Sequence, residues 1–284
     1  MTLNQGVYIT KLLDRFKMST CKGRTTPMEV GHTLTHPQGP DGKEVDVPYP
    51  QLLGALMYLM VCTRPDLAYS ISVLSRFMAK GKHTNSHWKA ATRVLQYLKH
   101  TKNWSLILGG TGEIKLTGHC DSSWADDLST RKSTLGFCFS LGRGMVSWKA
   151  KLSSCQALSS AEAEYYAACE AVKEGQWLTG LLEELGVKVS PYTLKCDSQS
   201  AIAIIKNPII NARSKHIELK YHFIRDHVEA KELILHYVPT EDNWADCFTK
   251  ALPVAKLVPL CARFFDMPKK APADDATLPK KAKL

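Results

Sequence analysis

The sequence predicts an α/β protein, in which a five-stranded mixed sheet is flanked by helices and preceded by a smaller, mainly helical region. Three observations carry this prediction. Five short stretches are typical of strands, and the one that leads to Asp121 alternates between apolar and polar residues as a half-buried strand does. Helical patterns separate the later strands, and helical periodicity dominates the first 108 residues. The five expected strands are residues 114–120, 135–141, 145–148, 192–197 and 233–238.

The region 1–108 is expected to be helical, apart from a long loop. Residues 24–48 are rich in Thr, Pro, Gly and His and show no period, which is typical of a loop. Arg64-Pro65-Asp66 suits a helix start, because Pro is tolerated in the first turn and Asp favours its positive end. Basic residues along the later helices either track a phosphate backbone or form a solvated face. The expected helices are residues 7–16, 49–62, 64–78 and one that begins at Asn85 or Ser86.

A second domain is expected over residues 113–252, because Gly109-Gly110-Thr111-Gly112 interrupts all periodicity. Its long helix, Ala161 to Leu185, opens with a Ser-x-x-Glu capping box and stops at Gly186. Small residues follow Glu164 along one stripe of this helix, so the helix can press closely on a sheet. Glu164 should then point towards the ends of two strands. Further helices are expected at residues 198–206, 213–229 and 242–250.

Length and composition limit the class of protein. The chain has 284 residues, 44% of them apolar, which is enough for one large or two ordinary domains. Its net charge of +10 favours a polyanionic partner such as nucleic acid. A merely soluble basic protein is the alternative.

Cysteine use and hydropathy indicate an intracellular, soluble, cytoplasmic protein. The nine cysteines are odd in number and include no Cys-x-x-Cys pair. They therefore look like small buried residues of a reducing compartment. No signal peptide is visible, and the longest apolar stretch, Leu52 to Val61, is too short to span a bilayer. We expect no membrane partner.

Four acidic residues are the candidate functional centre: Asp121, Glu164, Asp197 and Asp246. Asp121 and Asp197 end two expected strands, Glu164 lies one turn inside the long helix, and Asp246 lies in the first turn of the last helix. Strand ends and helix starts gather functional groups in an open α/β sheet. Taken singly, each acid is also explained as a turn or cap residue.

Carboxylates gathered at one place repel one another unless a cation lies between them. Oxygen ligands with open positions suit Mg²⁺ or Mn²⁺. We therefore predict a two-metal phosphodiester hydrolase.

The order of these acids and the residues that flank them resemble the ribonuclease H end of copia-type retrotransposon Pol polyproteins. The resemblance covers several ordered blocks over some 140 residues, and further blocks upstream resemble the thumb and connection of the same polyproteins. The blocks of the 113–252 region are Cys-Asp-Ser-Ser-Trp-Ala-Asp-Asp (120–127), Arg-Lys-Ser-Thr-Leu-Gly-Phe (131–137), Val-Ser-Trp-Lys-Ala-Lys (146–151), Ala-Leu-Ser-Ser-Ala-Glu-Ala-Glu-Tyr (157–165), Cys-Asp-Ser-Gln-Ser-Ala-Ile (196–202), Arg-Ser-Lys-His-Ile-Glu-Leu-Lys-Tyr-His-Phe-Ile-Arg (213–225) and Val-Pro-Thr-Glu-Asp-Asn-Trp-Ala-Asp-Cys-Phe-Thr-Lys (238–250). Those upstream include Tyr-Pro-Gln-Leu-Leu-Gly-Ala-Leu-Met-Tyr-Leu (49–59) and Thr-Arg-Pro-Asp-Leu (63–67).

The resemblance implies a role for each acid and a substrate. Asp121 would bridge two Mg²⁺ ions, Glu164 and Asp197 would hold one, and Asp246 would complete the other. The substrate would be the RNA strand of an RNA·DNA hybrid, which its 2′-hydroxyl distinguishes from DNA. The residues expected to contact nucleic acid are Ser122, Ser123, Ser198, Gln199, Arg213, Lys215 and His216.

Two departures from the family pattern bear on activity. Many ribonucleases H carry a His before the last helix, where this chain has Pro239-Thr240-Glu241. The usual Asp-Gly-Ser after the first strand is Asp-Ser-Ser here. The polymerase palm and a Tyr-x-Asp-Asp motif are missing, so we expect no polymerase activity from this chain alone. The missing palm and other element-encoded proteins are candidate partners.

Residues 268–284 are rich in Lys, Pro, Ala and Asp and are expected to form a disordered basic tail. Its Lys clusters could serve nuclear localisation. Two competing functions stay open: a catalytically inactive nucleic-acid-binding remnant of a degenerate retroelement, and a protein-interaction platform formed by the helical region.

Overall fold

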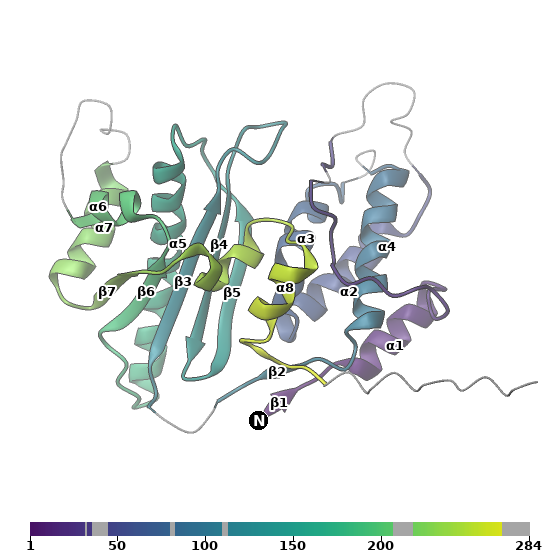
Figure 1. Cartoon of the computed structure of the whole chain (residues 1–284), viewed down its shortest axis with the longest axis horizontal. Coiled ribbons are helices and arrows are strands. Elements are labelled where there is room, and N and C mark those ends of the chain that lie inside the picture. The colour runs from purple at the N-terminus through teal and green to yellow at the C-terminus, as the bar shows by residue number, and fades with distance from the viewer. Residues whose placement is uncertain (32, 36–44, 80–82, 110–112, 207–217, 269–284) are drawn as a thin grey trace, which may run out of the picture.

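The structure is a computed structural model that describes residues 1–31, 33–35, 45–79, 83–109, 113–206 and 218–268, with the side chains of residues 218–222 left out. Its centre is a mixed sheet of five strands in the order β5-β4-β3-β6-β7 (Figure 1). Strand β3 pairs antiparallel with β4 and parallel with β6, and β6 pairs parallel with β7. These strands are β3 Leu116–Ser123, β4 Thr134–Leu141, β5 Gly144–Leu152, β6 Tyr192–Cys196 and β7 Leu233–Tyr237. The predicted α/β fold with a five-stranded mixed sheet is confirmed.

One face of this sheet is covered by helix α5 (Ser160–Glu184), with α6 (Gln199–Lys206) and α7 (Glu218–Glu229) beside it. The predicted stripe of small residues lies against the sheet. A Cβ on Gly175 would meet the ring of Tyr192 at 2.5 Å, so only glycine permits this approach. Helix α5 begins as predicted, because the Ser159 hydroxyl accepts a hydrogen bond from the Glu162 N–H at 3.2 Å.

The helical region lies on the other side of the sheet (Figure 1). Its core is continuous with residues of the sheet, since Cys138 of β4 and Met145 of β5 belong to the same buried cluster as the helices. The region also contains a small antiparallel sheet in the order β1-β2-β8. The elements of the helical region are β1 Thr2–Leu3, α1 Gly6–Arg15, α2 Tyr49–Cys62, the 3-10 turn η2 Pro65–Leu67, α3 Ala68–Ser75, α4 Asn85–His100 and β2 Ser105–Ile107.

A buried ion pair explains the Thr-Arg-Pro-Asp-Leu motif. The Arg64 guanidinium donates to both carboxylate oxygens of Asp66, at 2.9 and 2.6 Å, and to the Thr101 hydroxyl at 2.7 Å. The Tyr97 hydroxyl donates to Asp66 at 2.7 Å. The Arg64 and Asp66 side chains are 2% and 0% exposed, so this pair is part of the core.

The C-terminal segment returns to the helical region and lies between it and the sheet (Figure 1). It comprises the 3-10 turns η4 Thr240–Asp242 and η5 Trp244–Phe248, helix α8 Val254–Cys261 and strand β8 Phe265–Asp266. Phe265 pairs with Leu106 of β2, so residues near both ends of the described chain share one sheet. Sequence periodicity predicted neither α8 nor the short strands β1, β2 and β8.

The predicted helix over residues 242–250 is wrong in type and bounds, because η4 ends at Asp242 and only the 3-10 turn η5, Trp244–Phe248, forms within the stretch. Asn243 lies between them in an extended conformation, and its side chain bonds both the Ala245 N–H and the backbone of β3. The expected helix from Arg64 to Met78 also begins as a 3-10 turn and ends as α3 at Ser75. Of the expected helix 213–229, the described part begins at Glu218.

Candidate metal centre

Asp121 and Asp197 lie side by side because β3 and β6 are parallel neighbours. Strand β3 continues to Ser123, so Asp121 lies inside the strand and not at its end as the sequence predicted. Cys120 of β3 pairs with Cys196 of β6. Asp121 and Asp197 are the next residues along the two strands, so both reach the same edge of the sheet. Asp121 is only 2% exposed, whereas Asp197 is intermediate.

Glu164 reaches this edge from α5, as the helical stripe predicted. Its Oε1 accepts hydrogen bonds from the Ser122 N–H at 3.3 Å and the Ser122 hydroxyl at 2.9 Å. Its Oε2 is buried and has no hydrogen-bond partner among the described residues. A carboxylate oxygen of Glu164, the Cys196 Sγ and a carboxylate oxygen of Asp197 all lie within 4.8 Å of one another. Glu164 therefore presents a fixed carboxylate with one oxygen free for a ligand.

Asp246 is brought to the site by the turn η5, which is fastened to β3. The Asn243 amide donates to the Cys120 carbonyl at 2.9 Å. His119 Nδ1 accepts the Trp244 N–H at 3.3 Å, and the two rings stack with centroids 4.7 Å apart. These contacts place Asp246 beside the strand that carries Asp121.

Two residues just after Asp246 complete this half of the site. The Thr249 hydroxyl donates a short hydrogen bond to Asp121 Oδ2. The Lys250 ammonium forms an ion pair with Asp246 and lies 3.9 Å from Asp121 Oδ2. Lys250 is the cation that the described part of the chain places between these two carboxylates.

Burial and mutual repulsion disfavour charge on these acids. Burial raises the pKa of Glu164 well above its usual range, and the negative charge of Asp121 raises it further. Burial likewise raises the pKa of Asp121, although Lys250 and the Thr249 hydroxyl partly oppose that effect. A divalent cation among these groups would remove the penalty on their charged forms.

The residues present fit a hard divalent cation. Four carboxylates supply oxygen ligands. The buried Oε2 of Glu164 accepts no hydrogen bond from the described residues, so its lone pairs are available to a metal ion. The thiol of Cys196 adds one softer donor near Glu164 and Asp197. The structure thus brings all four predicted acids to one edge of the sheet.

Of the other predicted site residues, the four serine and glutamine residues lie within the described part of the chain and the three basic ones do not. Ser122 bonds Glu164, and Ser198 caps α6 by accepting the Ala201 N–H at 3.2 Å. Ser123 ends β3, and Gln199 is exposed at the start of α6. Arg213, Lys215 and His216 lie outside the described residues. Sequence reasoning missed Thr249 and Lys250, although both stand in the Phe-Thr-Lys end of the quoted C-terminal block.

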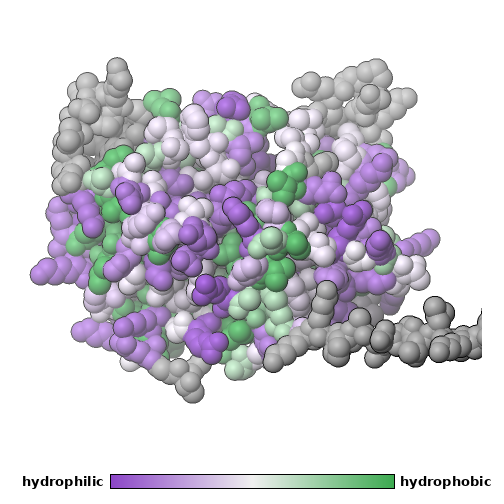
Figure 2. Space-filling view, viewed as in Figure 1, coloured by the Kyte–Doolittle hydropathy of each residue, from purple (hydrophilic) through white to green (hydrophobic). Residues whose placement is uncertain are grey.

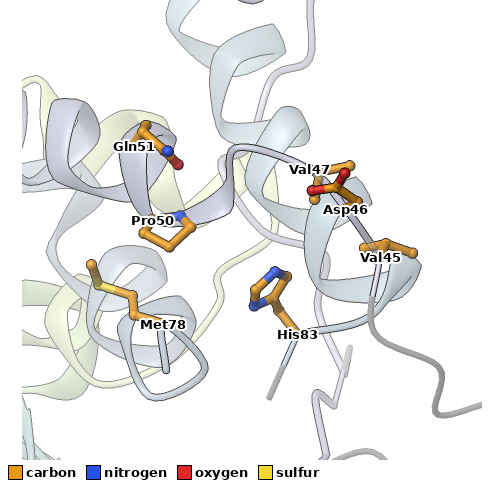
Figure 3. Close-up of a pocket in the computed structure, with 7 residues that line it drawn as sticks. All are labelled: Val45, Asp46, Val47, Pro50, Gln51, Met78 and His83. Atoms are coloured by element: carbon orange, nitrogen blue, oxygen red, sulfur yellow. The ribbon is translucent and has the colours of Figure 1, made fainter. Parts of the chain in front are cut away.

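Two hollows lie away from the four carboxylates. One of about 380 Å³ is lined by Pro50, Met78, His83 and neighbouring residues of the helical region (Figure 3). A groove of about 580 Å³ runs between α2, α3 and β5, with Met57 and Trp148 among its lining residues.

On the face shown in Figure 2, hydrophilic and hydrophobic residues are interspersed. Among the described helices, none is both long and apolar enough to cross a membrane.

Comparisons with known proteins identify the family. The Retrovirus-related Pol polyprotein from transposon TNT 1-94 of Nicotiana tabacum is 41% identical over 271 residues, which are 93% of this chain and 20% of that polyprotein. The polyprotein from transposon RE2 of Arabidopsis thaliana is 38% identical over 254 residues, 88% of this chain and 17% of that one. Secreted RxLR effector protein 161 of Plasmopara viticola is 48% identical over 134 residues, 47% of this chain and 93% of that protein.

The chain belongs to the family of retrovirus-related Pol polyproteins of transposons. It spans about one fifth of the length of the curated polyproteins that it matches. No family model matches the chain.

Solved structures resemble the chain more weakly. LC11-RNase H1 is 16% identical, with a TM-score of 0.38, over 48% of this chain and 94% of that one. The foamy viral protease-reverse transcriptase in complex with an RNA/DNA hybrid is 13% identical, with a TM-score of 0.41, over 68% of this chain and 24% of that one. Likenesses at this level do not assign an activity.

Proposed function

We propose that this chain is the ribonuclease H part of a copia-type retrotransposon reverse transcriptase, which hydrolyses the RNA strand of RNA·DNA hybrids with two Mg²⁺ or Mn²⁺ ions. The observation that carries the proposal is the convergence of four carboxylates at one sheet edge, one of them with a buried, unpartnered oxygen. Asp121 lies inside strand β3, Glu164 in helix α5, Asp197 directly after strand β6 and Asp246 in the 3-10 turn η5.

In this proposal Asp121, Glu164, Asp197 and Asp246 hold the metal ions. Bound metal would activate a water molecule and stabilise the leaving 3′ oxygen. The chain's own task is to fix the carboxylates. Ser122 holds one oxygen of Glu164, and Thr249 holds one oxygen of Asp121, so each carboxylate keeps a defined orientation.

Substrate contacts are proposed from the residues around this edge. Ser123 ends β3 two residues after Asp121, and Gln199 begins α6 two residues after Asp197, so both are proposed as contacts of a hybrid bound over the carboxylates. The net charge of +10 supports binding to a phosphate backbone. Recognition of the RNA strand would come from hydrogen bonds to its 2′-hydroxyls.

The test is cleavage of an RNA·DNA hybrid labelled on its RNA strand, with Mg²⁺, Mn²⁺ and EDTA compared. Asp197→Asn removes one carboxylate charge with little change in shape, and should abolish cleavage. Asp226→Asn on the exposed side of α7 is the matched control and should cleave like the wild type. Duplex DNA should stay intact.

A folded wild-type protein that binds the hybrid but leaves its RNA whole in both metals would overturn the enzyme proposal and favour the inactive binding remnant. Titration at several salt concentrations separates binding modes, because nucleic-acid binding should weaken steeply with salt. Action inside the cell is proposed from the cysteine use of the sequence, and the polymerase palm is proposed as a partner from the resemblance of residues 1–108 to the thumb and connection.

A further inference from the structure

The two halves of the candidate metal centre differ in how their negative charge is balanced. On one side, Glu164 and Asp197 have no ion pair among the residues that the structure describes. On the other side, the Lys250 ammonium contacts Asp246 and lies 3.9 Å from Asp121. The site is therefore asymmetric before any metal enters it.

The position of Lys250 is set by the local backbone. It follows Asp246 by four residues, and Thr249, between them, donates both to Asp121 and to the Asp246 carbonyl, the latter at 3.2 Å. The Asp121 and Asp246 side chains are 3% and 5% exposed, whereas that of Lys250 is 41% exposed. The carboxylates are thus fixed and buried, and the lysine reaches them from the solvent side.

An ammonium group is a compact cation on a flexible stem, so it can leave the carboxylates without disturbing the fold. It carries one positive charge where a divalent ion would carry two. A metal ion that bound between Asp121 and Asp246 would meet this ammonium at the same oxygens and repel it.

We propose that Lys250 is the resident counter-ion of the Asp121–Asp246 pair, so that a divalent cation binds there only by displacing its ammonium group. The inference rests on the proposed two-metal function and adds an order of loading. The first ion binds at the Glu164–Asp197 side, and the second binds more weakly because it competes with Lys250. Once displaced, the lysine is free to meet the phosphates of a bound hybrid.

The test is Mn²⁺ binding to the full chain without nucleic acid, followed by calorimetry and by electron paramagnetic resonance of free Mn²⁺. We expect one tighter and one weaker site in the wild type. Lys250→Met keeps the stem but removes the charge, and should tighten the weaker site by about tenfold while leaving the tighter one unchanged. Lys250→Arg should keep the weaker site weak. Lys256→Met, at an exposed position of α8, is the matched control.

An unchanged weaker site in Lys250→Met, with a thermal melt that shows a folded protein, would overturn the inference. Looser binding in that variant would overturn it too, since it would mean that Lys250 supports the metal. Neither result touches the proposed hydrolase activity, which the cleavage assay measures separately. A wild-type chain that binds no Mn²⁺ at all would overturn both.

Discussion

Gly136 is the residue whose replacement should disturb the candidate site without touching any of its carboxylates. It lies in β4 directly opposite Asp121. A Cβ built there would lie 2.7 Å from Thr249 Cγ2 and 2.8 Å from Phe248 Cβ, where ordinary contacts begin at 3.4 Å. Gly136→Ala must therefore move Thr249 and Phe248 away from the sheet, by at least 3.0 − 2.7 = 0.3 Å at the shorter contact and by 3.4 − 2.7 = 0.7 Å to restore an ordinary one.

The expected cost has two parts. Overpacking of a well-packed site destabilises a protein by about 1–3 kcal/mol. The same shift pulls the Thr249 hydroxyl from Asp121 and moves Asp246 with its turn, so metal binding on that side should weaken. The loss should be larger for cleavage, which needs the proposed metal ions, than for hybrid binding, to which the net charge of +10 contributes without them.

Urea unfolding followed by tryptophan fluorescence, with and without Mg²⁺, measures both parts. Gly180→Ala is the control, because a Cβ at that position of α5 meets nothing within 4 Å. Alanine should stabilise that helix by about 0.5–1 kcal/mol. If Gly136→Ala unfolds at the wild-type urea concentration and binds Mn²⁺ with wild-type affinity, the close packing of η5 on β4 is not what holds Asp246 in place.

Two further predictions concern buried charge. Asp66→Ala leaves the Arg64 guanidinium buried without its carboxylate and should lower the free energy of unfolding by about 3–5 kcal/mol. The double variant Arg64→Met, Asp66→Leu removes both charges and should lower it far less. Urea unfolding of the two variants measures the difference, and equal losses would contradict this prediction. Burial lowers the pKa of His119 to about 3 from 6.5 in the unfolded chain, so the stability it contributes is complete above pH 6.5 and falls as pH drops towards 3. Between pH 8 and pH 5 the wild type should lose about 2 kcal/mol more than His119→Phe, and equal losses would refute this account.

The sequence predicted elements whose cause is local. Helix α2 has the predicted bounds, Tyr49 and Cys62, because its apolar run and its flanking residues act over neighbouring positions. The run of β3 that leads to Asp121 alternates in polarity, and the stripe of small residues on α5 indicated that Glu164 faces the sheet. The sequence also led us to expect Asp121 and Asp197 together, because open α/β sheets gather functional groups at strand ends, whereas the parallel pairing of β3 with β6 that brings them together was seen only in the structure.

The sequence did not predict elements whose cause is distant. Strands β1, β2 and β8 have two or three residues each, too few to show a period, and they form only because they pair with one another. The turn η5 replaces an expected helix because Asn243 bonds the Cys120 carbonyl, 123 positions away. The roles of Thr249 and Lys250 depend in the same way on Asp121, which only the folded sheet brings near.

The four acids are supported by two different cores, and this division gives the asymmetry of the site a structural basis. Helix α5 and strand β6, which position Glu164 and Asp197, pack into the cluster on one face of the sheet. The turn that positions Asp246 packs into the other cluster, through Ala245 and Phe248, together with the helical region. Loosening the helical region should therefore disturb the Asp246 side of the site first and leave Glu164 in place. The helical region thus holds the turn that carries Asp246, on which the proposed second metal position depends.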